Sequence, residues 1–438
     1  MFSAGEYQSL YRDKLTSAED AVASVADGSL LTYGAMLAEP PAVLWAFANR
    51  LRGGDLKRLR IFGGPPTATS MDSVLALDLA DCVERCSQFV GAADRGLVRA
   101  GLTYYLPNHF YQLPRLIVEH MEIDVCATTV SPMDRSGFFS FGTNNDFIST
   151  AARCAKRMIV EVNEYMPRVH GDSRIHVSEV SAIVENHTPL CEVALWEPEP
   201  DDAPLARRIA GMIPDGATVQ LGVGALPSAV CAYLADRKDL GIHTEYMCPG
   251  LVDLVRAGVA TGAKKTLHRG KHVFTIAAGG PRMLDFLHDN PAFESYPVSH
   301  TNHPTVIAQN EHMVSVNSVI EVDLLGQCNA EVLAGHQFSG SGGQLDFVRG
   351  AYDAKGGTSI LAFQSTARKG TVSRIVPRLS ENAMVTTPRN DTHYLVTEHG
   401  SANLKGKSTR DRALAIIELA HPTFRDELMR AAEDLYIV

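Results

Sequence analysis

DGSLLTYG at residues 27–34 and DGATVQLG at residues 215–222 share one pattern, an Asp-Gly turn followed by an apolar run that ends in glycine. Each continues into a loop of small residues, a proline (Pro41 or Pro227), a helical stretch and an arginine. A generic turn between a strand and a helix would explain one such match. The agreement over the longer stretch favours a duplicated α/β unit, with a ligand-binding cleft between the two copies.

Short apolar runs alternate with helical stretches along the whole chain, which is typical of parallel sheets built from βαβ units. We expect strands at 59–62, 124–130, 157–162, 219–223, 272–277, 313–316, 359–362 and 394–397, and helices at 41–50, 203–212, 228–236 and 410–420. The acidic, proline-spaced segment 196–202 has no apolar periodicity and is typical of a linker. It predicts an N-terminal domain over 1–196 and a C-terminal domain over 203–438.

The composition restricts the class of protein. The chain has 438 residues, of which 45% are hydrophobic and 21% charged, and a net charge of -10. These values exclude a disordered or coiled-coil protein and argue against general nucleic-acid binding. Eight scattered cysteines without a CxxC pair indicate reduced thiols rather than a disulfide framework. No apolar leader or membrane-spanning run is visible, so we expect a cytoplasmic protein that does not bind membranes.

Several familiar motifs are absent or fail on spacing. The stretch 400–408 resembles a phosphate-binding P-loop, but five residues separate Gly400 from Gly406 where that loop requires four. ATP hydrolysis is therefore rejected. No GxGxxG fingerprint, GxSxG elbow or HExxH pair occurs, and none of the 16 histidines is assigned to a metal. The sequence thus predicts no metal site and no tightly bound cofactor.

Two glycine-rich loops and one carboxylate remain as candidates for chemistry. The loops are 222–227, which leads from an apolar run into a helix, and 339–344. Their backbone N–H groups are able to approach a ligand closely and to bind an anion, although tight or mobile turns would have the same composition. Glu245 ends a short apolar segment at the position where the first half has 61–64 and no acid. Beside amide-rich loops, such a carboxylate can act as a nucleophile on an activated acyl group.

At these residues the chain resembles the acetyl-CoA hydrolase/transferase family, and within it the 4-hydroxybutyrate and butyrate CoA-transferases. The matching stretches are SPMDRSGFFSFG (131–142), EVNEYMPRVHG (161–171), QLGVGALP (220–227), HTE (243–245), NSVIEVDLLGQ (317–327), SGSGGQLDFVRGA (339–351), STARKGTVSRIVP (365–377), VTTPRNDTHYLVTEHG (385–400) and AHPTFRDEL (420–428). The resemblance implies two related α/β domains with mainly parallel sheets, the CoA-transferase fold, and an active site in the cleft between them.

The resemblance also implies roles for particular residues. Glu245 would be the catalytic nucleophile, which takes CoA from an acyl-CoA as a glutamyl thioester and passes it to an acceptor carboxylate. Gln220 would be a second catalytic residue, in the loop near the reacting carbonyl. Backbone amides would bind the substrate and the oxyanion at Gly222, Gly224, Gly342 and Gly343. The cations for the CoA phosphates stay unassigned among Lys264, Lys265, Arg269, Lys271, Lys369, Arg374, Lys405 and Lys407. Coenzyme A is expected as a substrate, and a homo-oligomer is expected from the family.

The acceptor acid and the fate of the intermediate stay open. After Glu245 the stretch 246–250 departs from the family pattern, so the acid can differ from butyrate or 4-hydroxybutyrate and can be a dicarboxylate such as succinate or itaconate. An acyl-CoA hydrolase would use the same glutamate, with water as the acceptor. A non-catalytic CoA-binding protein is the third alternative.

Overall fold

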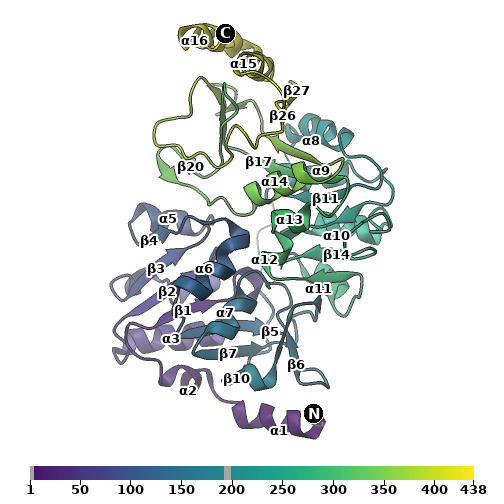
Figure 1. Cartoon of the computed structure of the whole chain (residues 1–438). Coiled ribbons are helices and arrows are strands. Elements are labelled where there is room, and N and C mark those ends of the chain that lie inside the picture. The colour runs from purple at the N-terminus through teal and green to yellow at the C-terminus, as the bar shows by residue number, and fades with distance from the viewer. Residues whose placement is uncertain (1–3, 192–198) are drawn as a thin grey trace. The chain divides into compact units, whose positions relative to one another are not determined.

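The computed structural model of the chain describes residues 4–191 and 199–438 (Figure 1). Their contacts define two compact units: unit 1 comprises Met1–Ala194 with Val273–Thr301, and unit 2 comprises Leu195–His272 with Asn302–Val438. Of the predicted linker at 196–202, residues 196–198 lie outside the described residues, and Asp202 already begins α8. The predicted domain boundary stays a prediction. Among the described residues, no helix combines the length and the apolar character needed to cross a membrane.

Unit 1 is built on a seven-stranded sheet with the order β10-β7-β5-β1-β2-β3-β4, in which neighbouring strands are parallel. The strands are β1 (Leu30–Tyr33), β2 (Leu59–Gly63), β3 (Val83–Ser87), β4 (Thr103–Tyr105), β5 (Val125–Val130), β7 (Arg157–Val162) and β10 (Ala182–Glu185). Its α-helices are α1 (Ala4–Lys14), α2 (Ala18–Ala23), α3 (Pro41–Gly53), α4 (Ala68–Asp72), α5 (Asp94–Arg99), α6 (Leu113–His120), α7 (Ile148–Cys154), α11 (Pro281–Leu287) and α12 (Val298–Thr301).

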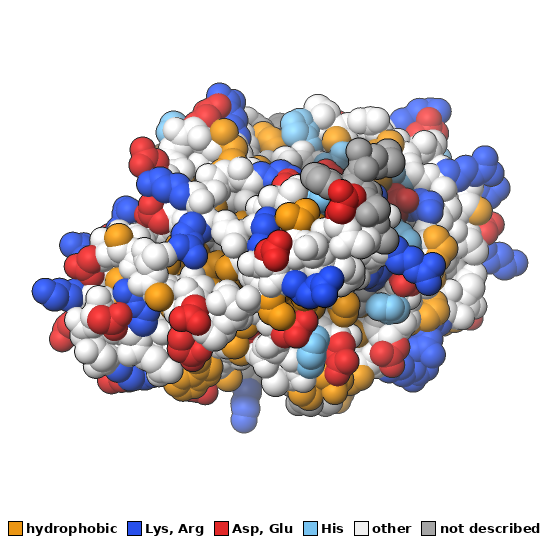
Figure 2. Space-filling view, turned by 90° about the horizontal axis from the view of Figure 1, so that it is seen from below, with side chains coloured by type: hydrophobic (Ala, Val, Ile, Leu, Met, Phe, Trp, Pro, Cys, Tyr) orange, Lys and Arg blue, Asp and Glu red, His pale blue; other side chains and the backbone are white. Residues whose placement is uncertain are grey.

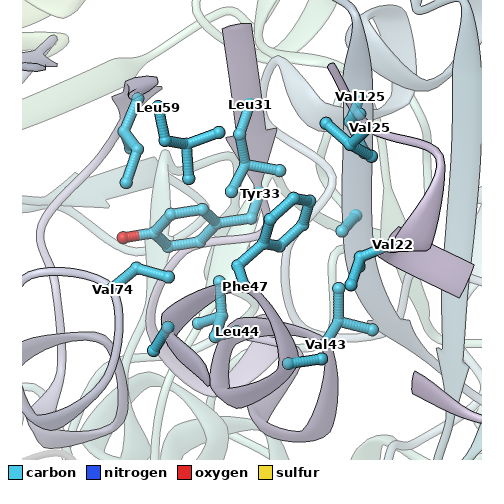
Figure 3. Packing of buried hydrophobic residues seen from close by; sticks show 14 of the residues in the cluster. Val22, Val25, Leu31, Tyr33, Val43, Leu44, Phe47, Leu59, Val74 and Val125 are labelled. Carbon is cyan, nitrogen blue, oxygen red and sulfur yellow. The ribbon is translucent and has the colours of Figure 1, made fainter. Parts of the chain in front are cut away.

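Two hydrophobic cores cover the two faces of this sheet, because successive side chains of a strand point to opposite faces. Val125 of β5 joins one core, with residues of α2 and α3, whereas Cys126 joins the other, with residues of α6 and α7. Figure 3 shows the first core, in which Leu31 and Tyr33 of β1 pack over Phe47 of α3. Burial on both faces explains why these strands are continuous apolar runs.

Unit 2 contains a six-stranded sheet with the order β12-β11-β17-β22-β26-β27, which is parallel except for the last pair. Its strands are β11 (Thr218–Leu221), β12 (Gly241–Ile242), β17 (Met313–Ser318), β22 (Thr358–Ala362), β26 (Tyr394–Thr397) and β27 (Gly400–Asn403). Its α-helices are α8 (Asp202–Gly211), α9 (Ala225–Ala232), α10 (Pro249–Arg256), α13 (Pro304–Ile307), α14 (Gln344–Asp353), α15 (Thr409–Glu418) and α16 (Pro422–Asp434).

The sheets share one topology, which confirms two related α/β domains with mainly parallel sheets. The order β2-β1-β5-β7-β10 of unit 1 corresponds to β12-β11-β17-β22-β26 of unit 2. The repeated turns also agree: Gly28 and Gly216 have φ angles of 75° and 76°. Their N–H groups donate to Arg58 O and Lys238 O, each at 2.8 Å. The positive φ explains why glycine follows the aspartate in both copies.

The two arginines that close the repeated pattern make equivalent contacts. Arg50 donates to Val22 O of α2 at 2.6 Å, and Arg237 donates to Ala210 O of α8 at 2.9 Å. Arg50 lies within α3 and Arg237 lies in the segment after α9, and each donates to the helix that precedes the repeated strand. Because both the strands and these helix contacts are repeated, the generic-turn explanation is no longer needed.

Most of the expected elements are present, with two differences. The expected helix at 228–236 is α9 (Ala225–Ala232), which begins and ends earlier than expected, and Pro227 is tolerated in its first turn. The expected strand at 272–277 is interrupted at Thr275 and forms β14 (His272–Phe274) and β15 (Ile276–Ala277). The segment Val273–Thr301 packs with unit 1, although the chain on both sides of it belongs to unit 2.

Candidate active site

Glu245 lies just beyond β12, at the carboxyl end of the unit 2 sheet, and precedes β13 (Tyr246–Met247). The two residues before it, His243 and Thr244, are fully buried, whereas Glu245 itself is partly exposed. The His243 N–H donates to Val219 O of β11 at 3.1 Å, and Thr244 Oγ1 donates to Tyr246 O at 3.2 Å. These bonds fix the backbone on both sides of Glu245 and leave its carboxylate at the strand end.

A buried asparagine holds the Glu245 carboxylate. Asn302 Nδ2 donates to Glu245 Oε2 at 2.6 Å, and the Asn302 side chain, at the start of the segment that leads into α13, is fully buried. Within the described part of the chain, Asn302 Oδ1 is buried without a hydrogen-bond partner. A short bond from an amide to a carboxylate is charge-assisted and restrains the rotamer of the glutamate. Asn302 therefore restrains the direction of the whole carboxylate group.

Gly343 packs directly against this pair. A Cβ built at Gly343 would overlap both Glu245 Oε2 and Asn302 Nδ2. Gly343 is also the residue before α14, and its carbonyl accepts the Phe347 N–H at 3.0 Å. Its φ of -91° is open to any residue, so glycine is needed here for the close approach and not for the backbone conformation. The neighbouring Gly342 has a φ of 50°, where glycine is favoured.

Gln220 and Asn317 form a reciprocal amide pair across β11 and β17. Gln220 Nε2 donates to Asn317 Oδ1, and Asn317 Nδ2 donates to Gln220 Oε1, both at 3.1 Å. Both side chains are buried, with exposed fractions of 3% and 7%. A Cβ at Gly222 would lie 3.0 Å from Asn317 Oδ1, so the glycine allows the loop to pass over this pair.

These groups gather at one edge of unit 2. The strands β12, β11 and β17 are neighbours, and residues 222–224, Glu245 and Ser318 stand at their carboxyl ends. The first residue of α14, Gln344, donates to Ser318 O at 2.8 Å, and the ring of Phe347 contacts His243. The first turn of α14 is thereby fixed beside the glutamate. The carboxyl edge of a parallel sheet is where α/β proteins bind their ligands.

The predicted loop glycines Gly222 and Gly224 differ in their hydrogen bonding and backbone conformation. The Gly222 N–H donates to Val316 O at 2.8 Å, so this amide is used by the sheet and is not available to an oxyanion as predicted. Gly224 has a φ of 137° and directly precedes α9, whose first turn presents N–H groups. Sequence reasoning missed Asn302 and Asn317, because their roles depend on contacts with residues 57 and 97 positions away.

Two of the cations considered for phosphate binding are structural. Lys265 is 3% exposed, and its Nζ donates to Ile242 O at 2.8 Å and to Lys271 O at 2.9 Å. It holds the end of β12, just before the segment that carries Glu245. Burial and the nearby Lys265 charge lower the pKa of His272 to about 4, which keeps that imidazole neutral at pH 7. Arg374 is similarly directed inward and donates to Ile320 O at 2.7 Å.

The remaining candidate cations carry no assignment to phosphate. On the face shown in Figure 2, Lys and Arg side chains are mixed with Asp and Glu side chains. In the described ranges 4–191 and 199–438, no cluster of three or more His, Cys, Asp or Glu side chains is arranged to hold a metal ion.

Comparisons with known proteins agree with this geometry. Residues 2–193 match the acetyl-CoA hydrolase/transferase N-terminal domain, and residues 279–432 match the C-terminal domain of the same family. The 4-hydroxybutyrate coenzyme A transferase of Clostridium kluyveri is 42% identical, over 97% of this chain and 98% of its own length. The chain belongs to the acetyl-CoA hydrolase/transferase family.

Solved structures of relatives have the same fold. The crystal structure of RipA from Yersinia pestis is 51% identical, with a TM-score of 0.95 over 99% of this chain and 100% of that one. The structure of a 4-hydroxybutyrate CoA-transferase from Porphyromonas gingivalis is 35% identical, with a TM-score of 0.84 over 98% of this chain and 100% of that one. The predicted CoA-transferase fold is thereby confirmed.

Proposed function

We propose that the protein is an acyl-CoA:carboxylate CoA-transferase that works through a covalent glutamyl-CoA thioester on Glu245. The reaction class follows from homology to CoA-transferases over the whole chain. The observation that carries the mechanism is the setting of Glu245: a partly exposed carboxylate at a sheet edge, oriented by Asn302 and packed against Gly343. A carboxylate held in one direction is a better nucleophile than a freely rotating one, since fewer orientations must be lost before attack.

The first half-reaction consists of two substitutions. A carboxylate oxygen of Glu245 attacks the thioester carbonyl of the acyl-CoA, and the CoA thiolate leaves, which gives an acyl-glutamyl anhydride. The thiolate then attacks the glutamyl carbonyl, and the acyl group leaves as a carboxylate with the bridging oxygen. No net proton is taken up or released, so the mechanism needs no general acid. The acceptor carboxylate reverses these steps and takes the CoA.

Each tetrahedral intermediate places negative charge on an oxygen that must be stabilised. The N–H groups at the start of α9 and α14 are the proposed donors, following Gly224 and Gly343 at the same sheet edge as Glu245. Removing one donor of this kind typically lowers kcat by about 10²–10³-fold. Gln220 contributes by fixing Asn317 beneath the Gly222 turn, and so acts as a positioning residue.

The substrates are an acyl-CoA and a small mono- or dicarboxylic acid. Tyr246 and Met247, in the stretch that departs from the family pattern implied by the resemblance, are 5% and 0% exposed, so their side chains belong to the interior near Glu245. A screen of acetate, butyrate, 4-hydroxybutyrate, succinate and itaconate as acceptors for acetyl-CoA tests the class. Formation of the acceptor's CoA ester, with parallel lines in double-reciprocal plots, is expected for a ping-pong transferase. Release of free CoA without acceptor ester would identify a hydrolase, and absence of both would favour a binding protein.

A further inference from the structure

Two cysteines contact each other beside the proposed nucleophile. Cys231 lies near the end of α9 and is 5% exposed. Cys248 directly precedes α10, three residues after Glu245, and is partly exposed. Their thiols are hydrogen-bonding partners, and both are free cysteines. Neither thiol has a part in the proposed transferase chemistry.

The packing around this thiol pair leaves little room for adjustment. A Cβ at Gly250, in the first turn of α10, would lie 2.9 Å from both Cβ and Sγ of Cys231. The backbone of α10 therefore rests directly on the Cys231 side chain. Glycine is required here by the close approach, and any movement of the Cys231 sulfur is transmitted to the start of α10.

The position of Cys248 directly before α10 favours it over Cys231 as the nucleophile of the pair. The hydrogen bond from Cys231 lowers the pKa of Cys248, as do the N–H groups of Gly250 and Leu251 at the start of α10. Cys248 Sγ does not accept a capping hydrogen bond from this helix, so the backbone N–H groups lower the pKa of Cys248 through their electrostatic effect. Burial and the same thiol contact raise the pKa of Cys231 well above its usual value. A stabilised thiolate in contact with a second thiol is the usual arrangement of a peroxide-sensitive pair.

We propose that Cys231 and Cys248 are a redox-active pair, which hydrogen peroxide oxidises to a disulfide that suppresses the chemistry at Glu245. The Cys248 thiolate attacks one peroxide oxygen and becomes a sulfenic acid, with hydroxide as the leaving group. The Cys231 sulfur then attacks the sulfenic sulfur, and water leaves. Two thiols lose two electrons in total, and one peroxide becomes two waters.

The disulfide would act on both sides of the nucleophile. Its S–S bond of about 2.05 Å draws the two sulfurs closer than hydrogen-bonding contact allows. It would join α9, which begins after Gly224, to α10, which begins after Glu245 and Cys248. A shift of about 1 Å in a reacting group can cost roughly 10²-fold in rate. We therefore expect oxidation to lower the transfer rate by about tenfold or more, and a dithiol reductant to restore it.

The test treats the purified full-length chain with hydrogen peroxide, removes the excess with catalase, and follows both structure and rate. Peptide mapping without reduction is expected to find the Cys231 and Cys248 peptides linked, with the loss of two hydrogen atoms. Cys231→Ser and Cys248→Ser should each retain the transfer rate after peroxide. The matched control is Cys154→Ser, which removes an exposed thiol of unit 1 and should leave the sensitivity unchanged.

Two results would overturn the inference: no linked peptide in the wild-type chain, or a linked peptide with an unchanged transfer rate. The mapping uses the wild-type chain and so does not depend on the folding of any variant. The rate effect rests on the proposed function, which is tested first on the reduced protein. If the reduced protein transfers no CoA, the proposed function fails, whereas the thiol pair is still judged by the linked peptide.

Discussion

The two copies of the repeated α/β unit carry different residues at the same place. Leu31 lies opposite Ile61 in unit 1, and Val219 lies opposite Ile242 in unit 2. Three residues beyond these partners come Gly64 and Glu245. The duplication thus supplies the same strand-end position twice, and only one copy has a side chain able to attack a carbonyl. The difference lies in one residue rather than in the topology.

The residues around this position also differ between the two units. In unit 1, Arg85 Nη2 donates a hydrogen bond to Gly64 O at 2.8 Å. The Arg85 side chain is fully buried and is paired with Asp94. A Cβ at Gly64 would lie 3.2 Å from Ala35 Cβ, which leaves no space for a glutamate. Unit 1 therefore uses the position for packing, whereas unit 2 keeps a partly exposed carboxylate there.

Glu161 of unit 1 is a buried glutamate with a structural role. Glu161 is fully buried and accepts from the Val43 N–H at 3.1 Å and from Asn186 at 2.7 Å. Burial raises its pKa to about 7. Both of its oxygens are used to hold the start of α3 and the segment after β10. It lacks the partial exposure that Glu245 has.

The largest expected effect comes from removing the asymmetry. Glu245→Ala should lower CoA transfer by roughly 10⁴-fold or more, because no other group supplies the covalent intermediate. The matched control is Glu311→Ala, which removes a partly exposed glutamate paired with Lys355 at 3.2 Å. Steady-state rates with saturating acyl-CoA and acceptor decide the comparison. Equal rates for the two variants would mean that the difference between Gly64 and Glu245 has no catalytic meaning.

Gly343→Ala is expected to lower kcat by about 10²-fold, because the new Cβ displaces Glu245 and Asn302 from their present contact. Gly211→Ala serves as the control, since a Cβ at that end of α8 meets nothing within 4 Å. Both variants should keep a cooperative unfolding transition in denaturant. A Gly343→Ala protein with the wild-type kcat would show that the close approach of α14 to Glu245 is not needed.

Asn302→Ala should lower kcat by roughly 10–10²-fold, which corresponds to the loss of one charge-assisted hydrogen bond. Asn310→Ala removes another fully buried asparagine of unit 2, whose Nδ2 donates to Ile307 O at 3.4 Å. This control measures the cost of losing a buried amide away from Glu245. If both variants lose the same fraction of activity, Asn302 acts through stability and not through the direction of the carboxylate.

The smallest expected effects concern the two equivalent strand positions beneath the loops. Gln220→Ala should lower the free energy of unfolding by roughly 1–3 kcal/mol, because Asn317 loses its buried partner. Thr32 occupies the matching position of β1, and its buried Oγ1 has no hydrogen-bond partner among the described residues. Thr32→Val should therefore be neutral or stabilising by about 1 kcal/mol. Shifts of the denaturant midpoint in opposite directions for the two variants would sharpen the comparison. Equal losses of unfolding free energy would contradict it.

The features that the sequence predicted are those determined by nearby residues. The Asp-Gly turns require glycine at a positive φ, and buried parallel strands require apolar runs, so the duplicated fold was visible as a repeat. The position of Glu245 followed from that repeat, and its role followed from the family resemblance. Both depend on order along the chain, which a sequence contains.

The remaining features depend on contacts between distant segments. Asn302 follows a short polar stretch that has no periodicity, and its bond to Glu245 joins residues that are 57 positions apart in the chain. Lys265 belongs to a basic run that is typical of an anion site, but its amine is buried and directed to carbonyl oxygens. The Gly222 amide is used by β17 and not by a ligand. Sequence patterns do not distinguish these outcomes, because the residue types fit both.

The most direct test of the central claim is to trap the intermediate. The purified, reduced protein is incubated separately with acetyl-CoA, butyryl-CoA and succinyl-CoA without acceptor acid, and borohydride then reduces any enzyme thioester. Peptide mass mapping is expected to find the Glu245 carboxyl group converted to an alcohol, and to find no such change in Glu245→Ala. Reduction at a different carboxylate, or at none while CoA stays bound, would contradict the assignment of Glu245 as the nucleophile.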